Sequence, residues 1–211
     1  MGDETHFGHD GGMSFVTPGF GGLRRKQQPD LPPGQYLAHD FPVLSAGPTP
    51  KVHTDRWEFV VTTETGEERT WTWAEFTALP HEDVTVDIHC VTKWSKLHTG
   101  WRGVPIDTLM QDVETAADFV MAHSYDGYTT NLPLEDLLDG KAWVAYRYEA
   151  DPLQAEHGGP ARLLVPHLYF WKSAKWIHGL RMMLEDEPGF WEEAGYHNYG
   201  DPWREQRYQG D

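Results

Sequence analysis

The segment from Val84 to Cys90 alternates apolar and polar side chains, with Val84, Val86, Ile88 and Cys90 in phase. An alternation with period two fits a β-strand that has one buried face and does not fit a helix. We therefore predict a strand at 84–90 whose last residue, Cys90, points inward. Cys90 is the only cysteine of the chain, so any thiol chemistry lies at the end of this strand.

Short strand patterns recur along the chain, whereas long helical patterns do not. Two apolar runs at 57–63 and 69–73, separated by Thr65-Gly66-Glu67, predict a β-hairpin. Further strands are predicted at 117–122, 143–148 and 161–165, short helices at 73–79, 105–110 and 132–138, and an edge strand or loop at 41–50. This mixture predicts an α+β, mainly β fold.

The chain has 211 residues, a length typical of one domain. Its composition predicts an irregular N-terminal arm at 1–35, a folded domain at 36–185 and an aromatic, acidic tail at 186–211 that wraps the surface. The net charge of −16 argues against nucleic acid or an anionic membrane surface as a partner. We find no apolar run long enough to span a membrane.

The expected compartment is the cytoplasm. Arg24-Arg25 resembles a twin-arginine export signal, but the polar sequence KQQPDLPPG follows where an apolar signal core is required. A single cysteine cannot form an internal disulfide, which fits a reducing compartment.

Two windows of the chain lack acidic residues, although the whole chain has 33 Asp and Glu against 17 Lys and Arg. They span 88–106 and 157–184, and their basic residues are Lys93, Lys96, Arg102, Arg162, Lys172, Lys175 and Arg181. If the windows meet in the fold, they form a basic cleft suited to a phosphate or pyrophosphate group. The first window would also stabilise the thiolate of Cys90. The alternative is that both windows belong to the apolar core.

The residue patterns alone leave several uses of Cys90 open. A lone cysteine on an apolar strand face is most often a small buried hydrophobic residue. Cys90 beside His89 suggests a zinc site, although neighbours on a strand face opposite ways and no second cysteine is present. A cysteine nucleophile with His157 or His167 as its base is a third interpretation.

Three motifs carry a resemblance to a known family: HCVTKWS at 89–95, HGGPARLLVP at 157–166 and SAKW at 173–176. Together they resemble the molybdopterin-binding domain of the sulfite oxidase family, and most closely the small bacterial branch related to the molybdenum subunit of a methionine-sulfoxide reductase. The resemblance covers roughly residues 36–185. It implies a sulfite oxidase-type fold of mixed sheets with short helices, and an oxidoreductase that holds molybdenum through molybdopterin.

The resemblance also implies a role for each matching residue. Cys90 would be the catalytic residue and the protein thiolate that binds molybdenum, a soft ligand of the kind such a metal requires. His157 and Arg162 would hold the pterin, with the arginine gripping the cofactor phosphate as a fork. The other cofactor-binding residues that it implies are Pro42, Val43, Leu44, Ser124, Ser173, Ala174 and Lys175.

The implied reaction is oxygen-atom transfer on a small S-oxide, N-oxide or related substrate. Where sulfite oxidases carry an Arg-Asn-His run, this chain reads Leu44-Ser45-Ala46, which disfavours sulfite as the substrate. The chain contains no haem domain, so we expect a separate electron donor or acceptor. The candidates for substrate contact are Trp94, Arg102, Tyr125 and Tyr128. The competing hypothesis is a non-catalytic protein that binds a phosphate-bearing ligand in a basic cleft, with Cys90 as an inert core thiol.

Overall fold

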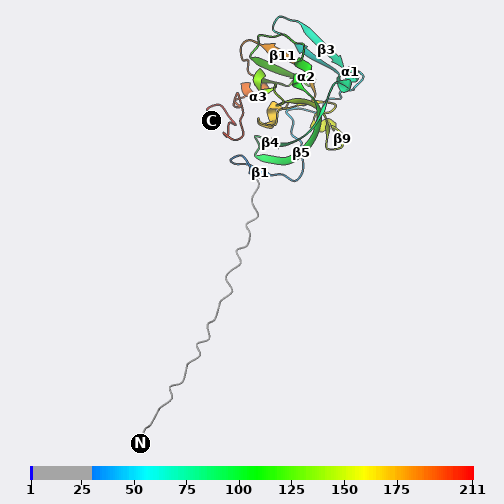
Figure 1. Cartoon of the computed structure of the whole chain (residues 1–211). Coiled ribbons are helices and arrows are strands. Elements are labelled where there is room, and N and C mark those ends of the chain that lie inside the picture. The colour runs from blue at the N-terminus through cyan, green and yellow to red at the C-terminus, as the bar shows by residue number, and fades with distance from the viewer. Residues whose placement is uncertain (2–29) are drawn as a thin grey trace. The chain divides into compact units, whose positions relative to one another are not determined.

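The computed structural model describes residue 1 and residues 30–211, which Figure 1 shows as a coloured ribbon. Leu31–Asp211 fold as one unit. Residues 2–29 lie outside the described part, and they contain the Arg24-Arg25 pair and most of the arm predicted at 1–35. The division of the chain into arm, domain and tail therefore stays a prediction.

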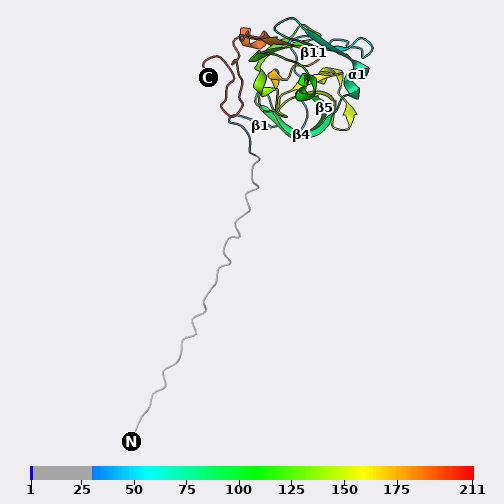
Figure 2. The same ribbon diagram turned by 45° about the horizontal axis from the view of Figure 1, so that its top comes forward.

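Two β-sheets form the body of Leu31–Asp211, and Figures 1 and 2 show them one above the other. The five-stranded sheet has the order β3-β2-β11-β6-β7. Its strands are β2 (Glu58–Thr62), β3 (Glu68–Thr72), β6 (Phe119–Ser124), β7 (Thr129–Pro133) and β11 (Ile177–Met183). β11 occupies the centre, parallel to β2 and antiparallel to β6.

The six-stranded sheet is organised around one long strand, β5 (Trp94–Pro105). Its main path runs β1-β5-β8-β10, while β4 pairs with β5 and β9 pairs with β8. The other strands are β1 (Tyr36–Leu37), β4 (Glu82–His89), β8 (Trp143–Tyr148), β9 (Asp151–Pro152) and β10 (Arg162–Leu164). The helical pieces are short: α1 (Trp73–Ala78), α2 (Ile106–Met110), α3 (Phe190–Glu193) and the 3-10 turns η1 (Leu134–Asp136), η2 (Ala155–His157) and η3 (Phe170–Lys172).

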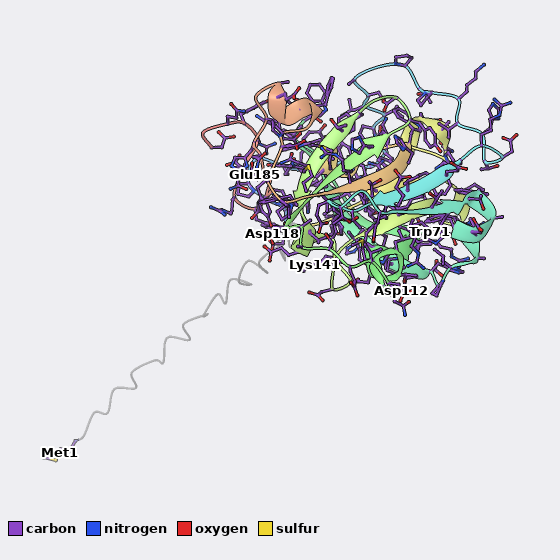
Figure 3. All side chains as sticks on the ribbon, turned by 90° about the horizontal axis from the view of Figure 1, so that it is seen from above. Met1, Trp71, Asp112, Asp118, Lys141 and Glu185 are labelled. Atoms are coloured by element: carbon purple, nitrogen blue, oxygen red, sulfur yellow. The ribbon has the colours of Figure 1, made fainter. Side chains whose placement is uncertain are left out.

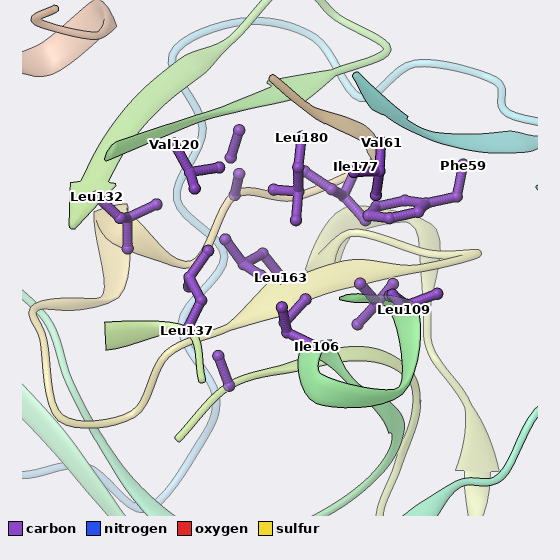
Figure 4. Close-up of a cluster of buried hydrophobic side chains, with 14 of the residues drawn as sticks. Phe59, Val61, Ile106, Leu109, Val120, Leu132, Leu137, Leu163, Ile177 and Leu180 are labelled. Atoms are coloured by element: carbon purple, nitrogen blue, oxygen red, sulfur yellow. The ribbon is translucent and has the colours of Figure 1, made fainter. Parts of the chain in front are cut away.

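The main hydrophobic core lies between the two sheets, and Figure 4 shows its side chains pointing toward one another. Val61 of β2 and Leu180 of β11 meet Leu163 of β10, while Ile106 and Leu109 of α2 close the side. Each of these five side chains is at most 1% exposed. Since burying one such side chain contributes roughly 1.5–3 kcal/mol, this layer is a main source of stability.

A second buried cluster contains Cys90 together with Ile88, Trp94 and Phe170, and the partly buried Val84 and Val86 pack against it. The predicted inward face of the 84–90 strand is therefore confirmed. This cluster holds the thiol at the protein interior rather than at the surface.

Most of the predicted elements are present, and the prediction of a mainly β, α+β fold with mixed sheets is confirmed. The 57–63 and 69–73 runs form the antiparallel β2-β3 hairpin. The predicted helix at 132–138 is wrong. Its first two residues end β7, and Leu134 still donates to the Asp118 carbonyl beside β6, so only the single turn η1 remains. Residues 41–50 form a loop. No helix of the described residues is long and apolar enough to cross a membrane.

The surface side of β3 is tied to the loop after α2. Figure 3 labels Trp71 and Asp112 on the same side of the body. Arg69 Nη1 lies 3.6 Å from Asp112 Oδ2, and the Arg69 guanidinium lies 4.9 Å from the centre of the Trp71 ring. Both charged side chains are well exposed, so this pair adds little to stability.

Helix α1 begins with a capping box. The Thr72 side chain accepts from the Glu75 amide, and Glu75 Oε2 accepts from the Thr72 amide over 2.9 Å. We expect Thr72→Ala to lower the free energy of unfolding by about 1 kcal/mol, because the Glu75 amide loses its side-chain acceptor. Urea denaturation measures this effect, with Thr70→Ala on the same strand as the control. Equal stability of the two variants would contradict the capping role.

Candidate active site

A cavity of about 300 Å³ opens beside Cys90. This volume lies at the lower end of the range for small-molecule sites. The cavity wall brings together segments that lie far apart in the sequence. These segments are the loop from Phe41 to Ala46, the turn that follows β4, the turn around Asp126, residues 156–162, residues 170–176, and residues 191–196.

Cys90 begins the tight turn that joins β4 to β5. The Cys90 amide donates to the Trp94 carbonyl over 2.8 Å, and the Lys93 amide donates to the Cys90 carbonyl over 3.0 Å. Lys93 has a φ of 78°, a left-handed conformation that closes the turn. The Thr92 hydroxyl donates to Cys90 Sγ over 3.2 Å. The turn therefore fixes the thiol at a defined point on the cavity wall.

Burial dominates the acidity of this thiol. Cys90 is only 7% exposed, and this burial raises the pKa of its thiol. The Thr92 hydroxyl and the Arg207 guanidinium act in the opposite direction, with smaller effects. The prediction that basic residues of the 88–106 window stabilise the thiolate is therefore wrong.

The basic side chains of the first window point elsewhere. Lys93 is exposed, and Lys96 Nζ donates to a backbone carbonyl, that of His39. Arg102 pairs with Asp83 across β4 and β5 at 2.7 Å and does not line the cavity. None of these three side chains lines the cavity, so they form no cleft there.

Two of the four basic residues of the second window are also neutralised outside the cavity. Lys172 Nζ forms a buried pair with Glu192, and Arg181 pairs with a surface carboxylate. Arg162 and Lys175 do line the cavity, but the same wall carries two acidic residues, Asp126 and Glu156. The prediction of a cleft built from both windows is wrong, and only one pair of cations remains from it.

The HGGP motif packs tightly against this pair of cations. Gly158 has a φ of 109°, and a Cβ at this position would lie 3.0 Å from both Arg162 Cβ and Lys175 Cβ. Glycine therefore allows the three segments to meet. The His157 ring stacks on Phe41 with 3.9 Å between ring centres and 9° between planes. This stack fastens the 41–46 loop to the motif.

Arg162 is a buried cation that holds neighbouring loops together. Nη1 donates to the His157 carbonyl over 2.8 Å and Nη2 to the Ser173 carbonyl over 2.6 Å, while Nε lies 3.4 Å from the Leu163 carbonyl. The guanidinium lies 4.0 Å from the centre of the Phe170 ring. Burial lowers the pKa of Arg162 to about 9. One N–H on each Nη atom is left for a ligand.

Lys175 connects the 41–46 loop to the cavity wall. Its Nζ donates to the Leu44 carbonyl over 2.7 Å and lies 2.6 Å from Ser45 Oγ. Burial, and then the charge of Arg162, lower the pKa of Lys175 to about 8. The ammonium is therefore charged at neutral pH. It binds the 41–46 loop, which the resemblance implies to be part of the cofactor site.

Most residues implied by the resemblance line this one cavity. They are Pro42, Leu44, Cys90, His157, Arg162, Ser173, Ala174 and Lys175, joined by Trp94 and Tyr128 from the substrate candidates. Four do not line it: Val43, Arg102, Ser124 and Tyr125.

Val43, Ser124 and Tyr125 each have a local reason for lying off the cavity wall. Val43 is 50% exposed, because its side chain faces away from the neighbours that line the cavity. Ser124 is buried at the end of β6, where its amide donates to the Tyr128 carbonyl. The Tyr125 hydroxyl is held by the Glu58 amide at 2.7 Å and donates to the Glu58 carbonyl.

Several lining residues escaped the sequence patterns. Trp191 and Tyr196 come from the predicted surface-wrapping tail, more than a hundred positions after Cys90. The aromatic content of that tail was the available signal, but it does not say where the rings lie. Phe41, Trp171 and Trp176 complete the aromatic part of the wall.

Two of the other interpretations of Cys90, the zinc site with His89 and the pairing with His167, find little support. His89 is 5% exposed, and its Nδ1 lies 2.8 Å from Ser95 Oγ. Among the described residues, no three His, Cys, Asp or Glu side chains are grouped to hold a metal ion. His167 Nε2 lies 3.1 Å from Asp136 Oδ1 and does not line the cavity, so it is not a base for Cys90.

A two-sheet fold places one thiol, the buried Arg162 and the half-buried Lys175 on a single cavity wall. The chain belongs to the oxidoreductase molybdopterin binding domain family, whose family model matches residues 46–191. It is a sulfite oxidase-like oxidoreductase, and its cofactor is molybdopterin carrying molybdenum. This confirms the family predicted from the motifs.

Individual relatives agree with this assignment. The chain is 40% identical to the uncharacterized oxidoreductase YuiH of Bacillus subtilis (strain 168), over 91% of this chain and 99% of that protein. It is 26% identical to the protein-methionine-sulfoxide reductase catalytic subunit MsrP of Pseudomonas syringae pv. tomato, over 75% of this chain and 52% of that protein, so it spans about half the length of MsrP. The crystal structure of the sulfane dehydrogenase SoxCD from Paracoccus pantotrophus has the same fold. That match has a TM-score of 0.58 at 16% identity and covers 65% of this chain and 40% of the SoxCD chain.

The residues on the cavity wall fit this cofactor. One thiol alone would leave most of a metal's ligand positions open. Molybdopterin would supply further ligands from its own organic group. Arg162 and Lys175 offer positive charge to the phosphate of the cofactor. The aromatic side chains of the wall offer apolar surface to its ring system. The Trp94 indole N–H on the same wall is buried and lacks a partner within residues 30–211, so it is a donor available to a ligand.

Proposed function

We propose that this oxidoreductase transfers an oxygen atom to or from a small S-oxide, N-oxide or related substrate, with Cys90 as the protein ligand to molybdenum. One observation carries the proposal: the only cysteine lies on the same cavity wall as Arg162 and Lys175. When bound, molybdopterin supplies a metal centre that exchanges one oxygen atom and two electrons with the substrate.

Cys90 acts in this proposal as a thiolate whose proton leaves when the metal binds. Burial keeps the proton on the free thiol, and a coordinating metal ion displaces it. The Thr92 hydroxyl, which donates to Sγ, holds the sulfur lone pairs in a fixed direction. A hydrogen bond to a metal ligand of this kind tunes the metal.

The two cations hold the organic part of the cofactor. Arg162 directs its free N–H groups and its charge toward the phosphate, while its other N–H groups keep the loops of His157 and Ser173 in place. Lys175 adds a second charge on the same wall. The rest of the proposed cofactor contact consists of Pro42, Leu44, His157, Ser173 and Ala174.

The substrate side favours a neutral oxide over sulfite. Leu44, Ser45 and Ala46 line the cavity without adding a cation. Arg162 and Lys175 are the basic residues on the described wall, and both serve the cofactor in this proposal. Trp94 and Tyr128 remain as candidates for contact with the substrate.

Electrons pass between this chain and a separate protein or small carrier. MsrP, which the chain resembles over part of its length, is itself named a catalytic subunit. We therefore expect an electron partner that is not encoded within the described domain.

Metal analysis and a substrate screen test the proposal together. Protein produced in a host that makes molybdopterin is expected to contain stoichiometric molybdenum. A screen of sulfoxides and N-oxides with a reductant, and of sulfite with an electron acceptor, is expected to show turnover of an oxide and none of sulfite. Folded protein without molybdenum would support the non-catalytic binder instead, and turnover of sulfite alone would overturn the substrate assignment.

A further inference from the structure

We propose that Arg207, from the C-terminal segment, is a positioning residue for Cys90. Arg207 lies beyond residues 46–191, the part of the chain that the family model matches. The inference rests on the proposed ligation of molybdenum by Cys90. It assigns to the end of the chain a function at the metal site instead of a covering role alone.

Arg207 joins three separate segments at the back of the Cys90 turn. Its Nη1 donates to the Val91 carbonyl over 2.6 Å, and its Nη2 donates to the Pro33 carbonyl over 3.2 Å. The guanidinium lies 5.0 Å from the centre of the Tyr169 ring. Arg207 is only 7% exposed, so these contacts form away from solvent.

The contact to Val91 matters because few other groups hold this turn. Within the turn, the hydrogen bonds between Cys90, Lys93 and Trp94 close the chain. From outside, Gln35 Nε2 donates to the Cys90 carbonyl over 3.0 Å. The Val91 carbonyl faces away from these and is held by Arg207. The Tyr36 amide donates to the Lys93 carbonyl over 2.8 Å. A hydrogen bond from a charged donor is stronger than one between neutral groups, so Arg207 is the firmest of these three outer supports.

The guanidinium of Arg207 is free to serve the turn because its ion pairing is weak. The carboxylate of Glu205 lies 3.8 Å from Nε and is 50% exposed, so the pairing is loose. The short contact from Nη1 to the Val91 carbonyl is therefore the stronger of these two interactions.

The test compares Arg207→Met with Arg204→Met in the molybdenum-loaded protein. Arg204 lies in the same segment, is exposed and is absent from the cavity wall, so its replacement removes the same charge without touching the turn. We expect Arg207→Met to shift the thiolate-to-molybdenum absorption band and to weaken molybdenum retention roughly 10- to 100-fold, the usual effect of losing an outer partner of a metal ligand. Arg204→Met should match the wild type.

Arg207→Lys is the rescue variant, because lysine keeps the charge and a donor for the Val91 carbonyl. It should restore part of the band position and of the retention. Identical bands and retention in Arg207→Met and Arg204→Met would overturn the proposal. If Arg207→Met does not fold, Arg207→Gln takes its place, and a band and retention equal to those of Arg204→Met would overturn the proposal in the same way.

A further measurement separates this inference from the proposed function. In protein made without cofactor, hydrogen exchange of the amides at 91–94 should be faster in Arg207→Met than in Arg204→Met. Wild-type protein that takes up no molybdenum would defeat the proposed function. A wild-type band together with unchanged exchange and an unchanged band in Arg207→Met would defeat the positioning role alone.

Discussion

Replacing Cys90 by serine is expected to remove the thiolate-to-molybdenum absorption band and to lower oxygen-atom transfer by more than about 100-fold, beyond the loss expected for an outer partner of a metal ligand. A serine hydroxyl is a hard and weakly acidic ligand, whereas molybdenum in this cofactor calls for a soft thiolate. The fold should persist, because the two side chains are similar in size and Thr92 offers a hydrogen bond to either atom. Visible absorption and turnover of the loaded protein measure the effect.

Thr92→Val is the matched control for this experiment. It removes the hydroxyl that donates to Sγ but leaves the sulfur in place. We expect a shifted band and retained turnover in Thr92→Val, against loss of both in Cys90→Ser. A Cys90→Ser protein with the wild-type band and wild-type turnover would show that the sulfur does not bind the metal.

Glu192→Ala is expected to lower the free energy of unfolding by about 3–5 kcal/mol, the usual cost of removing one partner of a buried ion pair. Lys172 Nζ lies 2.6 Å from Glu192 Oε1, with side-chain exposures of 0% and 1%. The same carboxylate accepts from Trp171 Nε1 and from Thr130 Oγ1. Loss of the carboxylate therefore leaves a buried ammonium with too few partners, and guanidinium denaturation measures the result.

Two control variants separate the effect of losing the buried charge from other effects of changing helix α3. Glu193→Ala changes the neighbouring, exposed residue of α3 and should stay within about 0.5 kcal/mol of the wild type. The double change of Lys172→Met with Glu192→Leu removes both charges and should be less destabilising than Glu192→Ala. If Glu192→Ala and Glu193→Ala have equal stability, the buried pair does not anchor the C-terminal segment.

Strands whose apolar residues alternate or form a short run were predictable from the sequence, and a strand without such a pattern was not. β2, β3, β4 and β8 were anticipated at nearly their observed bounds, because their apolar residues alternate or form short runs between turn residues. β11 was missed because a central strand between β2 and β6 shows no alternation.

β5 was missed for a different reason. It is the longest strand of the described chain at 12 residues, but its sequence contains two glycines and several basic residues that interrupt any apolar strand pattern. Its pairing with β4, β8 and β1 determines the strand, and such pairing depends on residues distant in sequence. Local propensity cannot supply this information.

The residues of the candidate site also divide into those that the sequence predicted and those that it did not. Motif residues such as Cys90, His157, Arg162 and Lys175 were predicted and do meet on one cavity wall. Their assembly was implied by the resemblance of their motifs to the sulfite oxidase family. Tail residues such as Trp191 were not predicted, because only the folded chain brings them beside the thiol.

Charge was the least reliable guide. The two acid-free windows suggested that seven basic residues would converge, but ion pairs across strands and with the tail use three of them, and only two line the cavity. An acid-free window says nothing about carboxylates that arrive from other segments, such as Asp83 or Glu192. Only contact with those partners reveals which charges remain at the cavity.

The most direct test of Cys90 ligation is X-ray absorption at the molybdenum edge of the wild-type and Cys90→Ser proteins. Ligation through residue 90 predicts one sulfur neighbour fewer around molybdenum in the serine variant. An equal number of sulfur neighbours in the two proteins would contradict it.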